Sequence, residues 1–163
     1  MTRITVISDT HARSLKELPQ GIVQALAESD YVVHCGDFTH LSLLTELRLV
    51  SRHFVGVHGN VDQREVREEL PAKTVFEVEG RRIGVIHPHW GGAPFGIEEA
   101  VAQEFHGVDL ILFGHTHDIY QAQIGDVLLV NPGQAYPDFR TPASMALVTI
   151  GENGIDVQVR VVE

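Results

Sequence analysis

Short apolar runs rich in β-branched residues recur along this chain, and they constrain its fold more than any other feature. Runs of this length and composition are typical of buried strands. In the first half of the chain they alternate with stretches whose apolar residues have helical spacing. The predicted strands are residues 3–7, 31–34 and 53–57, and the predicted helices are residues 18–29 and 41–50.

The second half of the chain changes from alternation to strand pairing. Residues 73–79 and 81–86 meet at Gly80 and predict a hairpin. Strand–helix alternation followed by strand pairing predicts an α/β fold, in which a mixed sheet system has helices on the outside. The remaining predictions are a helix over residues 96–107 and strands over residues 109–113, 119–124, 127–130, 143–150 and 155–161.

Length and charge limit the functions that the chain can have. The 163 residues contain no linker or repeat, so we expect one domain that spans residues 1–163. The net charge is −10, and lysine and arginine form no cluster, which argues against long nucleic acids as partners. The first residues include no apolar run long enough for a signal peptide or a membrane helix. We therefore expect a cytoplasmic protein without a membrane partner.

Five of the predicted strands end in residues that can bind a metal ion. Loops at the carboxyl ends of strands converge in α/β sheets, so we expect these residues to lie together. Their oxygen and nitrogen atoms, without sulfur, suit Mn²⁺, Fe, Zn²⁺, Co²⁺ or Ni²⁺ better than Mg²⁺ or Ca²⁺ alone. Seven ligands are too many for one catalytic ion but fit two ions that share a carboxylate. The candidates are Asp9, His11, Asp37, Asn60, His87, His115 and His117.

The sequence around these candidates resembles the calcineurin-like metallophosphoesterase superfamily, and the short chain resembles its small bacterial and archaeal phosphodiesterase branch. The five strings occur in the order typical of the family, and each follows a predicted strand. They are DTH at 9–11, HCGD at 34–37, GNVD at 59–62, HPH at 87–89 and GHTH at 114–117. The resemblance implies a four-layer αββα sandwich of two mixed β-sheets flanked by helices.

The resemblance also implies a cofactor and a reaction. Two divalent metal ions, with Mn²⁺ favoured, would support hydrolysis of small phosphate esters, chiefly diesters, by attack of a metal-activated water on phosphorus. Asn60 would also contact a phosphate oxygen, and His89 is the other catalytic candidate, either as a phosphate contact or as a spectator. The implied ligands are Asp9, His11, Asp37 and His117 for one ion, and Asp37, Asn60, His87 and His115 for the other, with Asp37 shared.

The chain departs from the family pattern at three positions, one of which is Pro88 in the block that usually reads HGH. Larger members carry a histidine after the asparagine, as a phosphate contact and general acid, and this chain has Val61 there. The acid role is therefore vacant unless it is filled by His40, His58 or His89. The block that usually reads NPGS ends here in Gln134, which leaves the contacts of that loop open.

Three other residues in these five strings are expected to have structural roles. Asp62 is expected to orient or cap a loop, without binding metal. His34 lies inside a predicted strand, which favours a place in the core or behind the ligands. Cys35 has no basic partner in a triad-like arrangement, so we expect a small packed residue and not a nucleophile.

Two other functions are compatible with the resemblance. The retromer subunit of the VPS29 type shares the fold but is a protein-binding scaffold with a compromised metal site, and the complete ligand set of this chain favours catalysis. A nuclease of the same superfamily is disfavoured by the acidic balance. The sequence does not choose among small phosphoester substrates, and it leaves the oligomeric state open, although members of this branch often form homo-oligomers.

Overall fold

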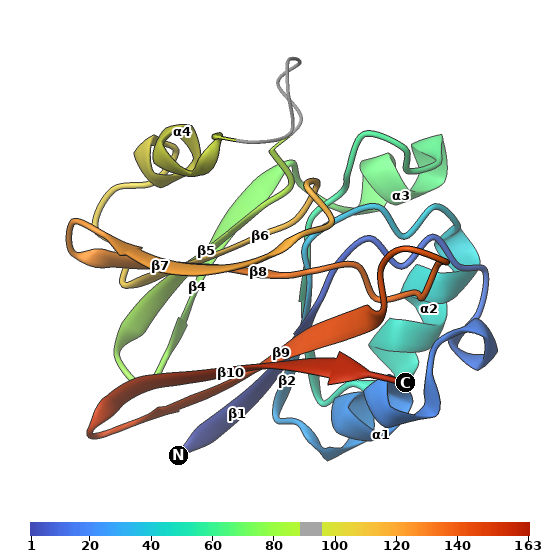
Figure 1. The fold of residues 1–163 in the computed structure, drawn as a ribbon, viewed down its shortest axis with the longest axis horizontal. Helices are drawn as coiled ribbons and strands as arrows, with labels where there is room; N and C mark the ends of the chain where they lie inside the picture. Colours follow the sequence, from blue (N-terminus) through green and yellow to red (C-terminus); the bar gives the residue numbers. More distant parts are fainter. Residues whose placement is uncertain (89–95) are drawn as a thin grey trace.

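The computed structural model describes residues 1–88 and 96–163, and its strands form two five-stranded sheets that pack face to face (Figure 1). The first sheet has the order β10-β9-β1-β2-β3. Strands β1, β2 and β3 are parallel to one another, and β9 runs antiparallel to both β1 and β10. The strands are β1 (Thr2–Ile7), β2 (Tyr31–His34), β3 (His53–Gly56), β9 (Ala143–Gly151) and β10 (Gly154–Val162).

The second sheet has the order β4-β5-β6-β8-β7. Strands β5, β6 and β8 are parallel, whereas β4 and β7 are antiparallel to their neighbours. Both sheets are therefore mixed, as the sequence predicted. The strands are β4 (Lys73–Val78), β5 (Arg81–Ile86), β6 (Leu110–Phe113), β7 (Ile119–Ile124) and β8 (Val127–Pro132).

Helices cover the outer faces of the two sheets, which confirms the four-layer αββα sandwich (Figure 1). Helices α1 (Gln20–Glu28) and α2 (Leu41–Val50) pack on the first sheet, and α4 (Glu98–Gln103) packs on the second. The short α3 (Arg64–Glu69) follows β3, and a 3₁₀ turn at Leu15–Glu17 precedes α1. Within residues 1–88 and 96–163, no helix combines the length and the apolar content that crossing a lipid bilayer requires.

The alternation of side chains along each strand explains the layers. Ile4 and Val6 of β1 point into the core between the sheets, whereas Ile7 belongs to the core beneath α1 and α2. In β6, Leu112 lies between the sheets and Phe113 lies under α4. Because successive side chains point to opposite faces, a short run of apolar residues fills two cores at once.

Most of the predicted elements are present within a residue or two of their expected ends. The helix predicted over residues 96–107 is shorter, since α4 ends at Gln103. Phe105 and Val108 turn inward to join the core between α4 and the second sheet, and this packing ends the helix early. The 3₁₀ turn was not predicted, because three residues are too few to show a helical period.

We predict that Leu112→Ala lowers the free energy of unfolding by about 2–5 kcal/mol, because it leaves a cavity in the core between the sheets. The Leu112 side chain is fully buried. The matched control is Leu49→Ala, whose side chain is 80% exposed on α2 and whose loss should cost no more than about 0.5 kcal/mol. Urea unfolding followed by circular dichroism measures both, and equal midpoints for the two variants would contradict the prediction.

Candidate metal centre

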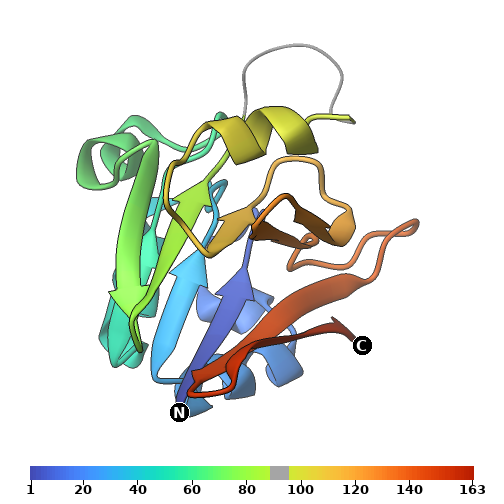
Figure 2. The ribbon, with the colours of Figure 1, turned by 90° about the vertical axis from the view of Figure 1, so that its left-hand side faces the viewer.

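Five loops that follow β1, β2, β3, β5 and β6 meet at one end of the two sheets. Figure 2 shows the arrowheads of β1, β2 and β5 pointing to the same end of the molecule. Three of these loops belong to the first sheet and two to the second. The face-to-face packing of the sheets therefore places residues that are distant in the sequence around one space.

The backbone at this end is unusual. Seven non-glycine residues in the described parts of the chain have a positive φ, and five of them are candidate ligands. This left-handed conformation is sparsely populated by residues with a Cβ, and such residues cluster at functional sites. The five φ angles are 51° for Asp9, 46° for His11, 62° for Asp37, 82° for His115 and 65° for His117.

Glycines allow the loops to approach one another closely. A Cβ on Gly59 would lie 2.1 Å from Oδ1 of Asp37, and a Cβ on Gly114 would lie 2.0 Å from the hydroxyl of Ser8. Neither distance is sterically possible, so both positions require glycine while the loops keep this arrangement.

Asp9 lies at the centre of the candidate ligands and is fully buried. Its Oδ2 accepts hydrogen bonds from the Ser8 hydroxyl at 2.6 Å and from the backbone N–H of His115 at 3.1 Å. Its Oδ1 is buried and makes no hydrogen bond within the part of the chain that the structure describes. Nε2 of His117 lies 3.3 Å from this oxygen. A buried carboxylate oxygen is costly unless a cation compensates it, which the protonated ring of His117 does in the metal-free protein and a metal ion would do in its place.

His87 brings together ligand atoms from three loops. Its Nδ1 lies 2.8 Å from the carbonyl of Cys35, an acceptor, so Nδ1 carries the hydrogen and Nε2 faces the site. Nε2 lies 3.1 Å from Oδ2 of Asp37 and 3.0 Å from Oδ1 of Asn60. An imidazole held by a backbone carbonyl, with its other nitrogen directed at oxygen ligands, is the usual arrangement of a metal-binding histidine.

The potential ligand atoms form two groups in which every atom lies within 4.8 Å of the others. One group consists of Asp9, His11 and His117, and the other of Asp9, Asp37 and His87. His115 completes the set, since its ring stacks edge-on against the ring of His87 at 5.2 Å. All seven candidates thus lie in one network of contacts.

The two groups differ from the implied assignment in one respect. The carboxylate common to both groups is that of Asp9, whereas the resemblance implies Asp37 as the shared ligand. The role of Asp37 as the bridging ligand stays a prediction.

The electrostatics of the network favour cations. The contact with the Asp9 carboxylate raises the pKa of His117 to about 9. Burial alone would raise the pKa of Asp37, but the hydrogen bond and charge of His87 outweigh burial and lower this pKa to about 2. The carboxylates are therefore ionised at neutral pH while His117 holds a proton, and a divalent ion that bound there would displace that proton.

Two residues behind the ligands tie the loops together. Asp62 accepts hydrogen bonds from the backbone N–H groups of Asp37, Thr39 and Gly59, so it orients loops, as expected. His34 is fully buried and accepts a hydrogen bond at Nδ1 from the N–H of Gly36. Its Nε2 therefore carries a hydrogen and donates to the hydroxyl of Thr10. Burial lowers the pKa of His34 to about 3, which keeps the ring neutral.

Some residues of the site fall outside the sequence predictions. No motif pointed to Ser8 or Tyr136, although the Tyr136 ring lies 5.2 Å from the ring of His11 and 6.3 Å from that of His117. A tyrosine three residues beyond the Asn-Pro-Gly block is too weak a signal for a prediction. His89, predicted as a catalytic candidate, lies outside the described residues.

The donor set fits divalent metal ions. The buried, unbonded oxygen of Asp9 and the fixed ring orientation of His87 both point ligand atoms into one space. The atoms are carboxylate and amide oxygens with imidazole nitrogens, which suits borderline metals such as Mn²⁺ or Zn²⁺. No rearrangement of the ligand loops is needed to bring these atoms together.

A comparison with known protein families identifies the family of this chain. The model of the calcineurin-like phosphoesterase superfamily domain matches residues 2–153. The chain belongs to the calcineurin-like phosphoesterase superfamily. The family is metal-dependent, in agreement with the donor set of the site.

Relatives of this calcineurin-like phosphoesterase domain include archaeal proteins. A probable metallophosphoesterase of Methanothermobacter thermautotrophicus is 32% identical over 155 residues, covering 91% of this chain and 87% of that protein. The phosphodiesterase MJ0936 of Methanocaldococcus jannaschii is 26% identical over 144 residues, covering 81% and 83%.

Solved structures of two proteins have the same fold. Protein TM1076 of Thermotoga maritima superposes with a TM-score of 0.77 at 32% identity, covering 99% of this chain and 100% of that one. A Vps29 variant of Entamoeba histolytica has a TM-score of 0.74 at 22% identity and covers 99% of each chain. At that identity the Vps29 likeness concerns the fold alone.

We predict that Cys35 does not react with Ellman's reagent in the folded protein at mildly alkaline pH. Its side chain is fully buried, and burial raises the pKa of its thiol well above the ordinary value, so the reactive thiolate is absent. In urea the same reagent should titrate the one cysteine of the chain. Rapid reaction of the native protein would contradict both the packing and the interpretation of Cys35 as a non-nucleophile.

Proposed function

We propose that this protein is a phosphodiesterase that uses two divalent metal ions, with Mn²⁺ as the favoured ion, to hydrolyse small phosphate esters. The observation that carries the proposal is the convergence of seven ligand-type side chains from five strand ends. Seven ligands exceed the needs of a single catalytic ion. Structural zinc sites, by contrast, use four ligands and commonly include cysteine.

When bound, two such ions would polarise the phosphoryl group and lower the pKa of the attacking water. The residues of the chain would hold the two ions and orient the phosphate ester. Asp9, His11, Asp37 and His117 would hold one ion, and Asp37, Asn60, His87 and His115 would hold the other, with Asp37 shared. The Asn60 side chain lies at the exposed rim of the site, where its amide N–H₂ can donate to a phosphoryl oxygen.

The charge of the chain and the name of one relative bear on the substrate class. The net charge is −10 and lysine and arginine form no cluster in the sequence, which supports small esters over long nucleic acids as substrates. The relative MJ0936 is named a phosphodiesterase, which supports diesters over monoesters as substrates. We propose that the chain acts as a single domain, alone or as a homo-oligomer, in the cytoplasm.

A protein-binding scaffold is the second candidate, because Vps29 has the same fold. The discriminating feature is the ligand set. The scaffold is expected to have a compromised metal site, whereas this chain has all seven ligand-type side chains, and five of them adopt left-handed backbone conformations. These features support catalysis over the scaffold.

We predict that Mn²⁺-dependent hydrolysis of bis(p-nitrophenyl) phosphate is lost in Asp37→Asn. The amide removes a ligand charge next to His87. The matched control is Asp126→Asn, which makes the same chemical change in the exposed turn between β7 and β8 and should behave as wild type. Activity assays are combined with thermal unfolding, because an ion at 100 times its Kd should stabilise the folded wild type by about 2.7 kcal/mol.

Two results would overturn this function. Absence of hydrolysis by the wild type across Mn²⁺, Zn²⁺, Co²⁺ and Ni²⁺ would favour the scaffold. Full activity in Asp37→Asn would remove this carboxylate from the proposed centre.

We also predict that the hydrolysis rate depends steeply on the pKa of the leaving group. Val61 occupies the position of the general acid of larger family members, and its side chain is 46% exposed beside Asn60. A general acid contributes about 10²–10⁴-fold, so alkyl diesters should react slower than p-nitrophenyl diesters by at least about that factor.

Val61→His tests the origin of this dependence. It should accelerate alkyl diesters more than p-nitrophenyl diesters, whereas Val75→His, on the exposed side of β4, should change neither. Equal wild-type rates on both esters, with chemistry shown to be rate-limiting, would show that a general acid does assist the leaving group.

A further inference from the structure

Gln134 occupies the position at which the family usually has serine, and the backbone fixes it on both sides. The N–H of the next residue, Ala135, donates to the carbonyl of Ser8 at 2.9 Å. The N–H of Ser144 donates to the carbonyl of Gln134 at 2.9 Å. Gln134 is 2% exposed and is thus held between the end of β1 and the start of β9.

The side-chain amide of Gln134 has a partner for each of its two ends. Its Nε2 donates to the carbonyl of Tyr136 at 2.9 Å and to Oδ2 of Asp138 at 3.2 Å. Its Oε1 lies 3.0 Å from Nδ1 of His117. Because both partners of Nε2 are acceptors, the amide cannot be turned over without losing these hydrogen bonds.

This orientation determines the tautomer of His117. An amide oxygen can only accept, so Nδ1 of His117 carries a hydrogen and donates it to Gln134. Nε2 is then the ring nitrogen directed into the site, where it lies 3.3 Å from the buried Oδ1 of Asp9. Gln134 thereby does for His117 what the carbonyl of Cys35 does for His87.

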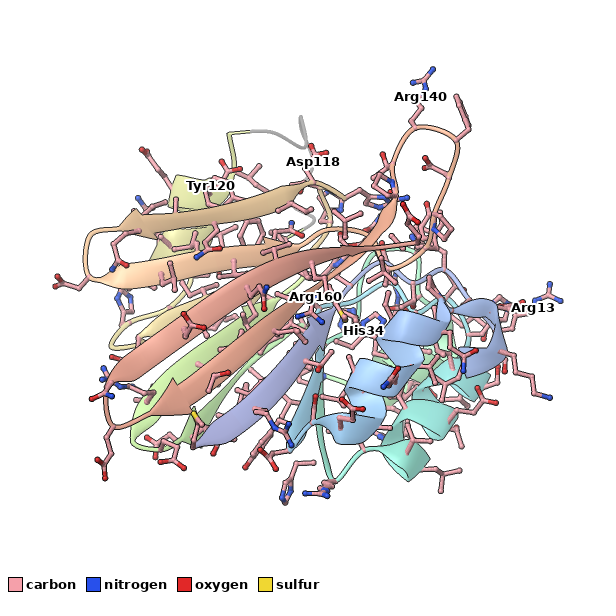
Figure 3. All side chains as sticks on the ribbon, turned by 60° about the horizontal axis from the view of Figure 1, so that its bottom comes forward. Arg13, His34, Asp118, Tyr120, Arg140 and Arg160 are labelled. Atoms are coloured by element: carbon pink, nitrogen blue, oxygen red, sulfur yellow. The ribbon has the colours of Figure 1, made fainter. Side chains whose placement is uncertain are left out.

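The Nε2 end of the Gln134 amide binds two residues of the loop between β8 and β9, Tyr136 and Asp138. Oδ1 of Asp138 accepts hydrogen bonds from the N–H groups of Arg140 and Thr141, so the loop is closed around this carboxylate. Arg140 stands at the tip of this loop and points away from the body of the molecule (Figure 3). Tyr136, by contrast, lies beside the rings of His11 and His117.

We propose that Gln134 is a positioning residue that orients His117 for metal binding and joins it to the loop that carries Tyr136 and Asp138. The inference rests on the proposed function, because it takes His117 to be a metal ligand. The serine that is usual in the family carries its hydroxyl directly on Cβ and is too short to reach both sides. The link between ligand and loop is therefore a property of the glutamine in this chain.

The test measures Mn²⁺ binding to the metal-free protein by isothermal titration calorimetry, with Mn²⁺ alone as the probe. Gln134→Met keeps the length of the side chain and removes both hydrogen-bonding ends, so affinity should fall by about 10–100-fold. Gln134→Glu keeps an acceptor for Nδ1 of His117 but loses the donor that faces Tyr136 and Asp138, so its affinity should fall less than that of Gln134→Met. Gln121→Met, on the exposed side of β7, is the matched control and should bind as wild type.

A spectroscopic readout separates positioning from general support of the fold. In the protein loaded with diamagnetic Zn²⁺, the Nδ1 proton of His117 should be protected from exchange and visible in the downfield proton NMR spectrum. The signal should persist in Gln134→Glu and disappear in Gln134→Met. If Gln134→Met fails to fold, Gln134→Ser carries the same test, because its hydroxyl cannot reach His117.

The outcomes separate this inference from the function on which it rests. Wild-type affinity in Gln134→Met, or equal weakening in the Met and Glu variants, overturns the positioning role. Absence of Mn²⁺ binding by the wild type, or undiminished binding by His117→Ala, instead overturns the proposed metal centre.

Discussion

The contact between the two sheets at the carboxylate of Asp9 is the constraint on which the site depends. Asp9 follows β1 of the first sheet, yet it accepts a hydrogen bond from the backbone of His115, which follows β6 of the second. The carbonyl of Cys35 and the ring of His87 make a second link of this kind. The candidate ligands are therefore held at fixed separations only while the two sheets keep their packing, and the core between the sheets serves the site as well as stability.

The site concentrates features that oppose folding. Buried carboxylates are costly to desolvate, and each residue in a sparsely populated backbone conformation costs on the order of 1–3 kcal/mol. The surrounding structure offsets these costs through Asp62 and His34, which bond to the backbone or side chains of the ligand loops. Such strain is retained where it places ligand atoms next to one another, as it does for Asp9, Asp37 and His117.

The fold alone does not determine the function of this chain, since Vps29 has the same architecture. The candidate ligands of this chain lie in the loops at the strand ends. Gln134 illustrates how one substitution in such a loop can change the contacts of a ligand without changing any strand. Its amide links His117 to Asp138, and both partners lie outside the regular elements of the sandwich.

The sequence by itself determined the strands, the helices and the identity of the candidate ligands, because these depend on local periodicity and on short motifs at strand ends. It also predicted the packed state of Cys35. Only the tertiary structure decided that Asp9 is common to both ligand groups, that α4 stops at Gln103, and that Gln134 bonds to His117. These features depend on contacts between residues far apart in the chain, such as Asp9 and His115 at a separation of 106 residues. No local pattern encodes such contacts, because they arise from how the two sheets pack.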